Sequence, residues 1–320
     1  MQQGFLGIDV GSVSTNFVIL AEDARVIETL YIRTKGQPIK TIKAGLQHVR
    51  NILKGKMEII AAGATGSARN LSGIMVGADI IKNEITAHAV AVSRIIPDAQ
   101  TIFEIGGQDS KIIILRNGIV TDFAMNTVCA AGTGSFLDQQ ASRLSIPIED
   151  FGKMALAARN PVRIAGRCGV FAESDMIHKQ QLGYNLEEII AGLCEALVRN
   201  YLNNVGKGKE ILAPIVFQGG VAANGGIAKA FEEILGQKVT VPKYYDVMGA
   251  LGVAYLALRN YRETGITKFK GLVTADYEFI AKSFECKGCA NNCEIINIHQ
   301  NDSLLARWGS RCGKWEHLDH

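Results

Sequence analysis

The 320-residue sequence has few prolines, no long apolar run and no dominant charge. Its six prolines and 48% hydrophobic content argue against disorder and predict a compact chain with two packed lobes. No run of about 18 apolar residues occurs, and the first residues lack the basic and apolar regions of a signal peptide. The formal net charge is only +3 and the basic residues are scattered. We therefore expect a cytoplasmic protein with no membrane partner and no nucleic-acid partner.

Two common nucleotide-binding motifs are also missing. No GxxxxGK[ST] segment occurs, which excludes a P-loop protein, and the first glycine turn is not GxGxxG, which excludes a Rossmann protein. The seven cysteines are an odd number in a chain without an export signal. Thiolate chemistry or metal binding is therefore a better explanation for them than a disulfide framework.

The clearest pattern is a strand, a glycine turn and a second strand. Residues 5–20 show it, and residues 101–115 repeat it about 100 residues later, which indicates an internal duplication with a nucleotide between the halves. A third glycine turn, at residues 219–224, follows a short apolar strand. Apolar residues at helical spacing predict helices at residues 38–53, 186–205 and 246–261.

The first turn suits a magnesium-bound phosphate, because Asp9 ends a strand and small hydroxyl residues follow it. Asp9 can hold Mg²⁺ directly or through water, while the amides and hydroxyls of the turn donate to phosphate oxygens. The second and third turns would form another backbone cradle and a flat surface for adenosine. For the first motif alone, an ordinary hairpin turn is an equal alternative. The expected nucleotide-binding residues are Gly11, Ser12, Val13, Ser14, Thr15, Gly106, Gly107, Gln108, Gly132, Gly219, Gly220, Val221, Asn224 and Gly249.

The three turns in this order resemble the acetate and sugar kinase, Hsp70 and actin superfamily. The resemblance implies an α/β, two-lobed, duplicated ribonuclease-H-like fold with a small cysteine-rich C-terminal extension. We expect ATPase lobe I at residues 1–95, completed by the helix near 246–262. Lobe II would span residues 96–245 and the cysteine-rich tail residues 267–320.

Cys129 and Cys168 each stand beside glycines and precede a predicted helix. Free amides and the positive end of a helix dipole stabilise a thiolate, the form that ligates iron. Two thiolates are too few for a cubane cluster, which normally takes four, but a twofold axis would supply two more from a second copy of the chain. Two buried structural cysteines are the alternative.

At these residues the sequence resembles a known family: the activator ATPases of 2-hydroxyacyl-CoA dehydratases, with the BadF/BadG/BcrA/BcrD ATPase subunits of benzoyl-CoA reductases and the reductases of double-cubane cluster proteins. The motifs that carry the resemblance, over residues 4–260, are NEITAHA, IGGQDSK, VCAAGTGSF, GRCGVFAESDMIH and QGGVAAN. It implies a homodimer with ATP and Mg²⁺ in each chain and one 4Fe-4S cluster held by Cys129 and Cys168 of both chains. Electrons would come from a ferredoxin or flavodoxin and pass to an iron–sulfur acceptor enzyme.

The expected catalytic residues are Asp9 for magnesium and Glu104 or Gln108 for positioning the attacking water. Glu84 and Asp109 are weaker candidates, since each is equally well explained as an ordinary polar residue near a turn.

The sequence departs from the family pattern at three places. Glu104 replaces the usual Asp, Asn16 stands where a Lys commonly follows the first turn, and TGSAR at residues 65–69 replaces TGYGR. We interpret His88 and His178 as structural, because a single His at helical spacing is more often a packed side chain than a ligand.

The tail carries a second cysteine pattern. Cys286, Cys289 and Cys293 form CxxCxxxC, and Cys312 follows. Four thiolates at this spacing suit Zn²⁺ or an iron–sulfur cluster, which spacing alone does not separate. The pattern resembles the segment after the ATPase domain in larger, fused activators.

Two other functions use the same ATP turns. A small-molecule kinase of the superfamily would need a carboxylate facing a hydroxyl substrate and would leave the cysteines unused. A non-enzymatic ATP-dependent switch or actin-like assembly protein would be colourless and would oligomerise with nucleotide. The sequence also leaves the acceptor open among a hydroxyacyl-CoA dehydratase, an aromatic-CoA reductase and a double-cubane protein.

Overall fold

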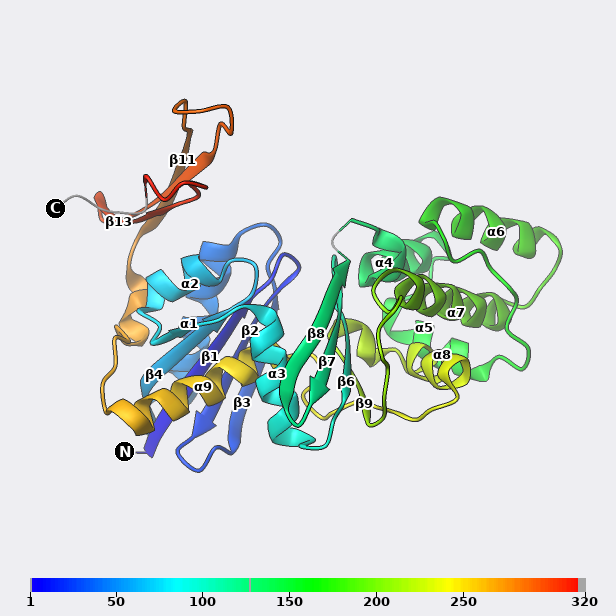
Figure 1. The fold of residues 1–320 in the computed structure, drawn as a ribbon, viewed down its shortest axis with the longest axis horizontal. Coiled ribbons are helices and arrows are strands. Elements are labelled where there is room, and N and C mark those ends of the chain that lie inside the picture. Colours follow the sequence, from blue (N-terminus) through cyan, green and yellow to red (C-terminus); the bar gives the residue numbers. More distant parts are fainter. Residues whose placement is uncertain (1, 127, 316–320) are drawn as a thin grey trace. The chain divides into compact units, whose positions relative to one another are not determined.

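The computed structural model describes residues 2–126 and 128–315 (Figure 1). The chain divides into two compact units. Unit 1 comprises the residues up to Glu84 together with those from Gly249 onward, and unit 2 comprises Ile85–Met248.

Unit 1 contains a five-stranded sheet of order β3-β2-β1-β4-β5. The first three strands form an antiparallel meander, while β4 runs parallel to β1 and β5 parallel to β4. The strands are β1 (Gln2–Val10), β2 (Ser14–Ala21), β3 (Val26–Arg33), β4 (Met57–Thr65) and β5 (Ile80–Ile81). The helices are α1 (Pro38–Leu53), α2 (Arg69–Val76) and α9 (Met248–Thr264).

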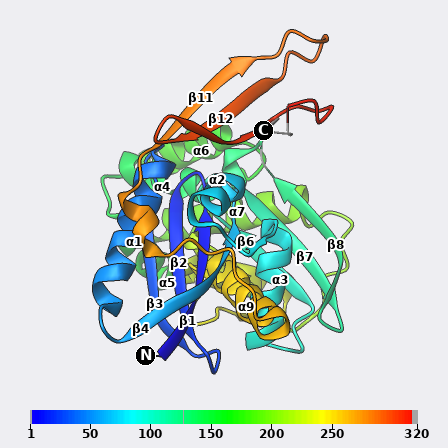
Figure 2. The same cartoon turned by 90° about the vertical axis from the view of Figure 1, so that its left-hand side faces the viewer.

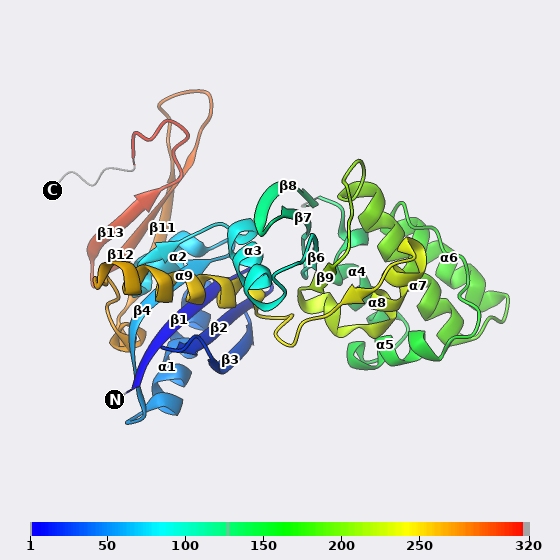
Figure 3. The same cartoon turned by 60° about the horizontal axis from the view of Figure 1, so that its bottom comes forward.

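Alternate residues of β1 face different helices, because successive side chains of a strand point to opposite faces. Leu6 and Ile8 belong to the same buried cluster as Leu46 of α1. On the other face a Cβ added at Gly7 would lie 1.9 Å from the carbonyl oxygen of Ala250, so α9 packs directly on the backbone there. Figure 3 shows α1 and α9 on opposite sides of this sheet.

Unit 2 repeats this topology, with a five-stranded sheet of order β10-β9-β6-β7-β8. Again three strands form an antiparallel meander and two further strands add in parallel. Read from the opposite edge, the order matches unit 1 strand for strand, which confirms the predicted duplication. The strands are β6 (Thr101–Ile105), β7 (Ser110–Arg116), β8 (Ile119–Asn126), β9 (Ile215–Gln218) and β10 (Val239–Thr240).

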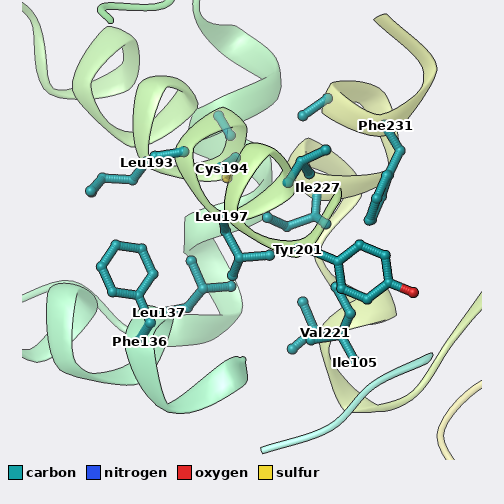
Figure 4. Packing of buried hydrophobic residues seen from close by; sticks show 14 of the residues in the cluster. Ile105, Phe136, Leu137, Leu193, Cys194, Leu197, Tyr201, Val221, Ile227 and Phe231 are labelled. Carbon is teal, nitrogen blue, oxygen red and sulfur yellow. The ribbon is translucent and has the colours of Figure 1, made fainter. Parts of the chain in front are cut away.

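Helix α7 runs through the core of unit 2 (Figure 4). Its Tyr201 is fully buried, contacts the ring of Phe231 edge-on at 5.4 Å and donates a 2.7 Å hydrogen bond to the carbonyl oxygen of Lys111. Such aromatic pairs add about 0.5–1.5 kcal/mol beyond area burial. The ring pair joins α7 to α8, and the hydrogen bond joins α7 to strand β7. Helices α5, α6 and α8 pack against α7. The helices of unit 2 are α3 (Glu84–Ile95), α4 (Gly134–Arg143), α5 (Ile148–Ala157), α6 (Gly169–Gln181), α7 (Leu186–Asn204) and α8 (Gly225–Leu235).

The predicted helices are confirmed: 38–53 matches α1, 186–205 ends one residue beyond α7, and 246–261 begins two residues before α9. Within the described residues, no helix is both long and apolar enough to cross a membrane.

The tail forms an antiparallel three-stranded sheet of order β11-β12-β13, whose first two strands lie side by side in Figure 2. Its base is anchored to α1 through two hydrogen bonds of 2.6 and 3.0 Å from Arg50 to Asp276, and through Phe279, which joins the buried cluster of unit 1. A short 3-10 helix, η3 (Leu272–Asp276), precedes the sheet. The strands are β11 (Phe279–Glu285), β12 (Glu294–Gln300) and β13 (Ser303–Trp308).

Candidate nucleotide and cluster site

Asp9 lies near the carboxyl end of β1 and is in register with Thr65 at the end of the parallel strand β4. Two glycines border its carboxylate. A Cβ added at Gly249, the second residue of α9, would lie 2.1 Å from Asp9 Oδ2, and one added at Gly66 would lie 2.5 Å from Oδ1. Thr65 Oγ1 is buried and has no hydrogen-bond partner. The backbone therefore closely approaches the Asp9 carboxylate at the amino end of a helix. Carboxylate oxygens are ligands that Mg²⁺ prefers, and helix amino ends commonly bind phosphate.

The turn after Asp9 is closed by a 2.8 Å hydrogen bond from Gly11 N to Ser14 O. Thr15 was expected to face the nucleotide, but its side chain is fully buried and its Oγ1 lies 3.0 Å from Thr34 Oγ1. The Thr15 hydroxyl therefore supports the turn from within the protein. Ser12 is exposed, while Val13 and Ser14 are half-buried.

In unit 2 the second glycine turn is joined to the start of α4. Gly134 N donates to Gly106 O at 2.9 Å, and Ser135 N donates to Gly107 O at 2.8 Å. The third turn meets them, since a Cβ at Gly134 would lie 3.1 Å from Cγ2 of Val221. The 3-10 turn η2 (Gly220–Ala223) forms this third turn, and Asn224 caps α8. These predicted residues thus lie together, at the carboxyl ends of β6 and β9, where α/β sheets commonly bind ligands.

Glu104 is held by Lys111, which sequence reasoning missed. Lys111 Nζ lies 3.0 Å from Glu104 Oε2 and 2.9 Å from Asp109 Oδ2, and the lysine side chain is only 2% exposed. Because this cation bridges both carboxylates, they fix the shape of the turn. Gln108 is exposed at its tip and is better placed to contact a water molecule. The sequence feature that could have indicated this ion pair was a lysine, Lys111, at the start of the apolar strand 111–115.

The remaining polar candidates lie elsewhere. Glu84 is the first residue of α3. His88 is buried with its Nδ1 2.9 Å from Gln218 Nε2, whereas His178 is exposed in the last turn of α6.

Cys129 and Cys168 both lie half-buried at the start of helical segments. Cys168 directly precedes α6, whereas Cys129 precedes the 3-10 turn η1 (Ala130–Gly132) and α4 begins only at Gly134. Asn126 fixes the Cys129 backbone, accepting from its amide at 2.9 Å and donating to its carbonyl at 2.8 Å. By contrast, burial raises the pKa of Cys194 to about 12, which leaves that thiol unsuited to metal binding.

Asn200, on α7, connects the two cysteine segments and was not predicted. Its Nδ2 donates to the carbonyl oxygen of Gly166 at 2.7 Å and lies 4.0 Å from Cys129 Sγ. Its side chain is 2% exposed and its Oδ1 accepts from Asn204 at 2.8 Å. The sequence signal for it was an asparagine directly before the apolar Tyr201, ahead of the Asn203–Asn204 pair that ends the helix.

Apolar side chains stand exposed beside both cysteines. Val128 is 96% exposed next to Cys129, and Val170 and Phe171 are 71% and 65% exposed just after Cys168. Exposed apolar groups of this kind commonly mark a protein interface.

The tail cysteines lie on the turn between β11 and β12 and after β13. Cys286 and Cys293 are half-buried, whereas Cys289 and Cys312 are exposed. Across residues 2–126 and 128–315, no three His, Cys, Asp or Glu side chains are gathered closely enough to hold a metal ion.

The fold and its glycine turns define a two-lobed protein of the acetate and sugar kinase, Hsp70 and actin superfamily. The BadF/BadG/BcrA/BcrD ATPase family matches residues 6–257, and the chain belongs to this family. The resemblance found in the sequence is thereby confirmed. The cysteine tail lies beyond the matched residues.

Individual relatives agree with this assignment. The (R)-2-hydroxyglutaryl-CoA dehydratase activating ATPase of Acidaminococcus fermentans is 36% identical over 262 residues, covering 79% of this chain and 96% of that protein. The crystal structure of (R)-2-hydroxyglutaryl-CoA dehydratase component A from Acidaminococcus fermentans has a TM-score of 0.73 at 33% identity, covering 81% of this chain and 99% of that one. The activator of the 2-hydroxyisocaproyl-CoA dehydratase from Clostridium difficile, with bound ADPNP, has a TM-score of 0.74 at 30% identity, covering 83% and 97%.

Proposed function

We propose that this chain is an ATP-hydrolysing activator that delivers low-potential electrons to an iron–sulfur partner enzyme, in the way its relatives are named for activating 2-hydroxyacyl-CoA dehydratases. The observation that carries the proposal is the bonding of the Gly106–Gly107 turn to the start of α4, at 2.9 and 2.8 Å. Because η1 and α4 follow Cys129 directly, a movement of the nucleotide turn is passed to the segment that carries this cysteine.

The groups for the ATP chemistry are proposed unit by unit. In unit 1, Asp9 would hold magnesium, with the backbone of Gly66 and Gly249 close beside its carboxylate. In unit 2 the backbone of the glycine turns would bind phosphate and adenosine, and Gln108 would orient the attacking water. The Lys111 bridge holds Glu104 and Asp109 in place, so that the turn would keep its shape when the phosphate charge changes.

The cysteine segments suit a 4Fe-4S cluster shared between two copies of the chain. Both thiols are partly accessible, and each directly precedes a helical segment, η1 for Cys129 and α6 for Cys168. When bound, the cluster would supply one-electron transfer. The exposed Val128, Val170 and Phe171 would be covered by the second copy, which also contributes the missing pair of thiolates.

Asn200 would keep the two segments in register, since one side chain contacts both. Hydrogen bonds and burial around the sulfur atoms set the potential of such a site. A shift of α4 on ATP binding would therefore change the reduction potential of the cluster, and with it the driving force for electron transfer to the acceptor. We propose a 2-hydroxyacyl-CoA dehydratase as the acceptor and a ferredoxin or flavodoxin as the donor.

The coupling step is tested with Ser135→Ala, compared with Ser142→Ala on the same helix. Ser135 contacts the carbonyl oxygen of Gly107 through both its amide and its hydroxyl, whereas Ser142 is exposed. The anaerobic protein is reduced, mixed with an iron–sulfur dehydratase and ATP, and phosphate release and dehydratase activation are followed together.

We expect Ser135→Ala to keep ATP hydrolysis but activate fewer dehydratase molecules per ATP, and Ser142→Ala to behave as wild type. If wild type, Ser135→Ala and Ser142→Ala activate the same number of dehydratase molecules per ATP, the proposed link from the Gly106–Gly107 turn through α4 is contradicted. Activation without any ATP would contradict the function itself.

A further inference from the structure

The tail presents four cysteines at one end of its small sheet. Residues 286–293 form the turn between β11 and β12, which is closed by a 2.8 Å hydrogen bond from Cys286 N to Cys293 O. Within it, Asn292 N donates to Cys289 O at 3.2 Å. Three of the cysteines therefore share one closed turn.

The segment with the fourth cysteine returns to the same end. β13 is antiparallel to β12, so its last residue, Trp308, lies near the start of β12, opposite Ile296. Gly309 follows with a φ of +113°, and a Cβ there would lie 2.3 Å from the carbonyl oxygen of Glu294, so only glycine fits this close crossing. The chain that carries Cys312 therefore passes beside the base of the turn.

Trp315 fixes this segment against the turn. Its Nε1 donates to Cys286 Sγ at 3.2 Å, and its ring meets Phe284 edge-on at 5.1 Å. Cys312 is three residues before this contact. A Cβ added at Gly288 would lie 3.4 Å from the same sulfur atom, so the CxxC turn curls closely around Cys286.

No apolar core holds this end of the sheet together. Residues 280–294 include no buried side chain. Extensions this small usually need a disulfide or a metal ion to stay folded. Lys287 and Arg311 adjoin Cys286 and Cys312 in sequence, and Lys314 Nζ lies 3.9 Å from the position of a Cβ added at Gly288. Their charges would offset the net charge of about −2 of a divalent ion with four thiolates.

We propose that Cys286, Cys289, Cys293 and Cys312 form a structural tetrathiolate site for one divalent metal ion, Zn²⁺ or Fe²⁺, separate from the ATP and cluster chemistry of residues 6–257. All four ligands come from the protein, so the site is closed and has no position for substrate. The half-buried Cys286 and Cys293 would form its base. The four thiols are not gathered in this structure, so the exposed Cys289 and Cys312 would have to turn inward when the ion binds.

The test compares metal content in the full-length chain, purified without oxygen after growth with added zinc or iron. The variants are Cys289→Ser and Cys312→Ser, with Cys289→His as a variant that keeps a ligand and Ser283→Ala, on exposed β11, as a control. Zinc, iron and acid-labile sulfide are measured per chain, together with the rate of proteolysis within residues 280–294.

We expect each Ser variant to lose one metal ion per chain with no loss of sulfide, and to be cleaved at least about tenfold faster in the turn. The identity of the lost ion distinguishes zinc from iron. Cys289→His and Ser283→Ala should keep the ion. Unchanged metal content in both Ser variants, or a loss of several irons together with sulfide, would overturn the proposal. Because Cys129 and Cys168 are intact in these variants, failure here would leave the proposed function untouched.

Discussion

Replacing Gly249 by Ala should disable ATP hydrolysis by displacing one carboxylate. The added Cβ would lie 2.1 Å from Asp9 Oδ2, whereas real Cβ contacts are essentially never below 3.0 Å. The carboxylate or the start of α9 must therefore move by about the difference, 3.0 − 2.1 = 0.9 Å. A misplacement of about 1 Å in a catalytic site can cost about 100-fold in rate.

The assay is the steady-state rate of phosphate release at saturating ATP and magnesium, with thermal unfolding measured in parallel. We expect about 100-fold slower hydrolysis for Gly249→Ala. Gly4→Ala is the control, because Gly4 lies on β1, the strand that carries Asp9, and its Cβ would meet only the flexible ends of Met57 and Ile59, at 2.7 and 2.8 Å. It should hydrolyse ATP normally. A Gly249→Ala protein with near wild-type activity would refute the role given to Asp9.

Three further outcomes follow from buried groups. Lys111→Met leaves the buried Glu104 carboxylate without its cation and should lower the free energy of unfolding by about 3–5 kcal/mol in urea titrations; a loss below about 1 kcal/mol would contradict the bridge. Asn200→Ala should shift the reduction potential of the bound iron, or lower iron retention, with ATP hydrolysis unchanged, and an unaltered potential and iron content would argue against its positioning role. Because burial raises the pKa of Cys194 to about 12, iodoacetamide at about pH 8 should leave this thiol unmodified in the native protein, and mass spectrometry would detect the contrary.

Local sequence patterns were enough to predict several helices and strands and the internal duplication. The helix at 38–53 and the strand–turn–strand segments follow from apolar spacing and glycine turns, which are properties of neighbouring residues. The family motifs extended this to the ATPase assignment and the superfamily fold.

Contacts between distant residues could not be read in this way. Lys111 pairs with Glu104 because β6 and β7 are in that register, and Asn200 reaches Cys129 across 71 residues of chain. The burial of Thr15 depends on Thr34, which lies beyond the next strand. Periodicity within one element carries no information on such partners.

The most direct test of the shared-cluster proposal is the iron and sulfide content of the anaerobic protein and of its Cys129→Ala and Cys168→Ala variants. To remove the tail's contribution, the measurement is made in chains that also carry Cys289→Ser. We expect a dimer with about four irons and four sulfides per two chains, and the loss of nearly all of both in either alanine variant. A full complement of iron and sulfide in Cys129→Ala or Cys168→Ala would contradict it.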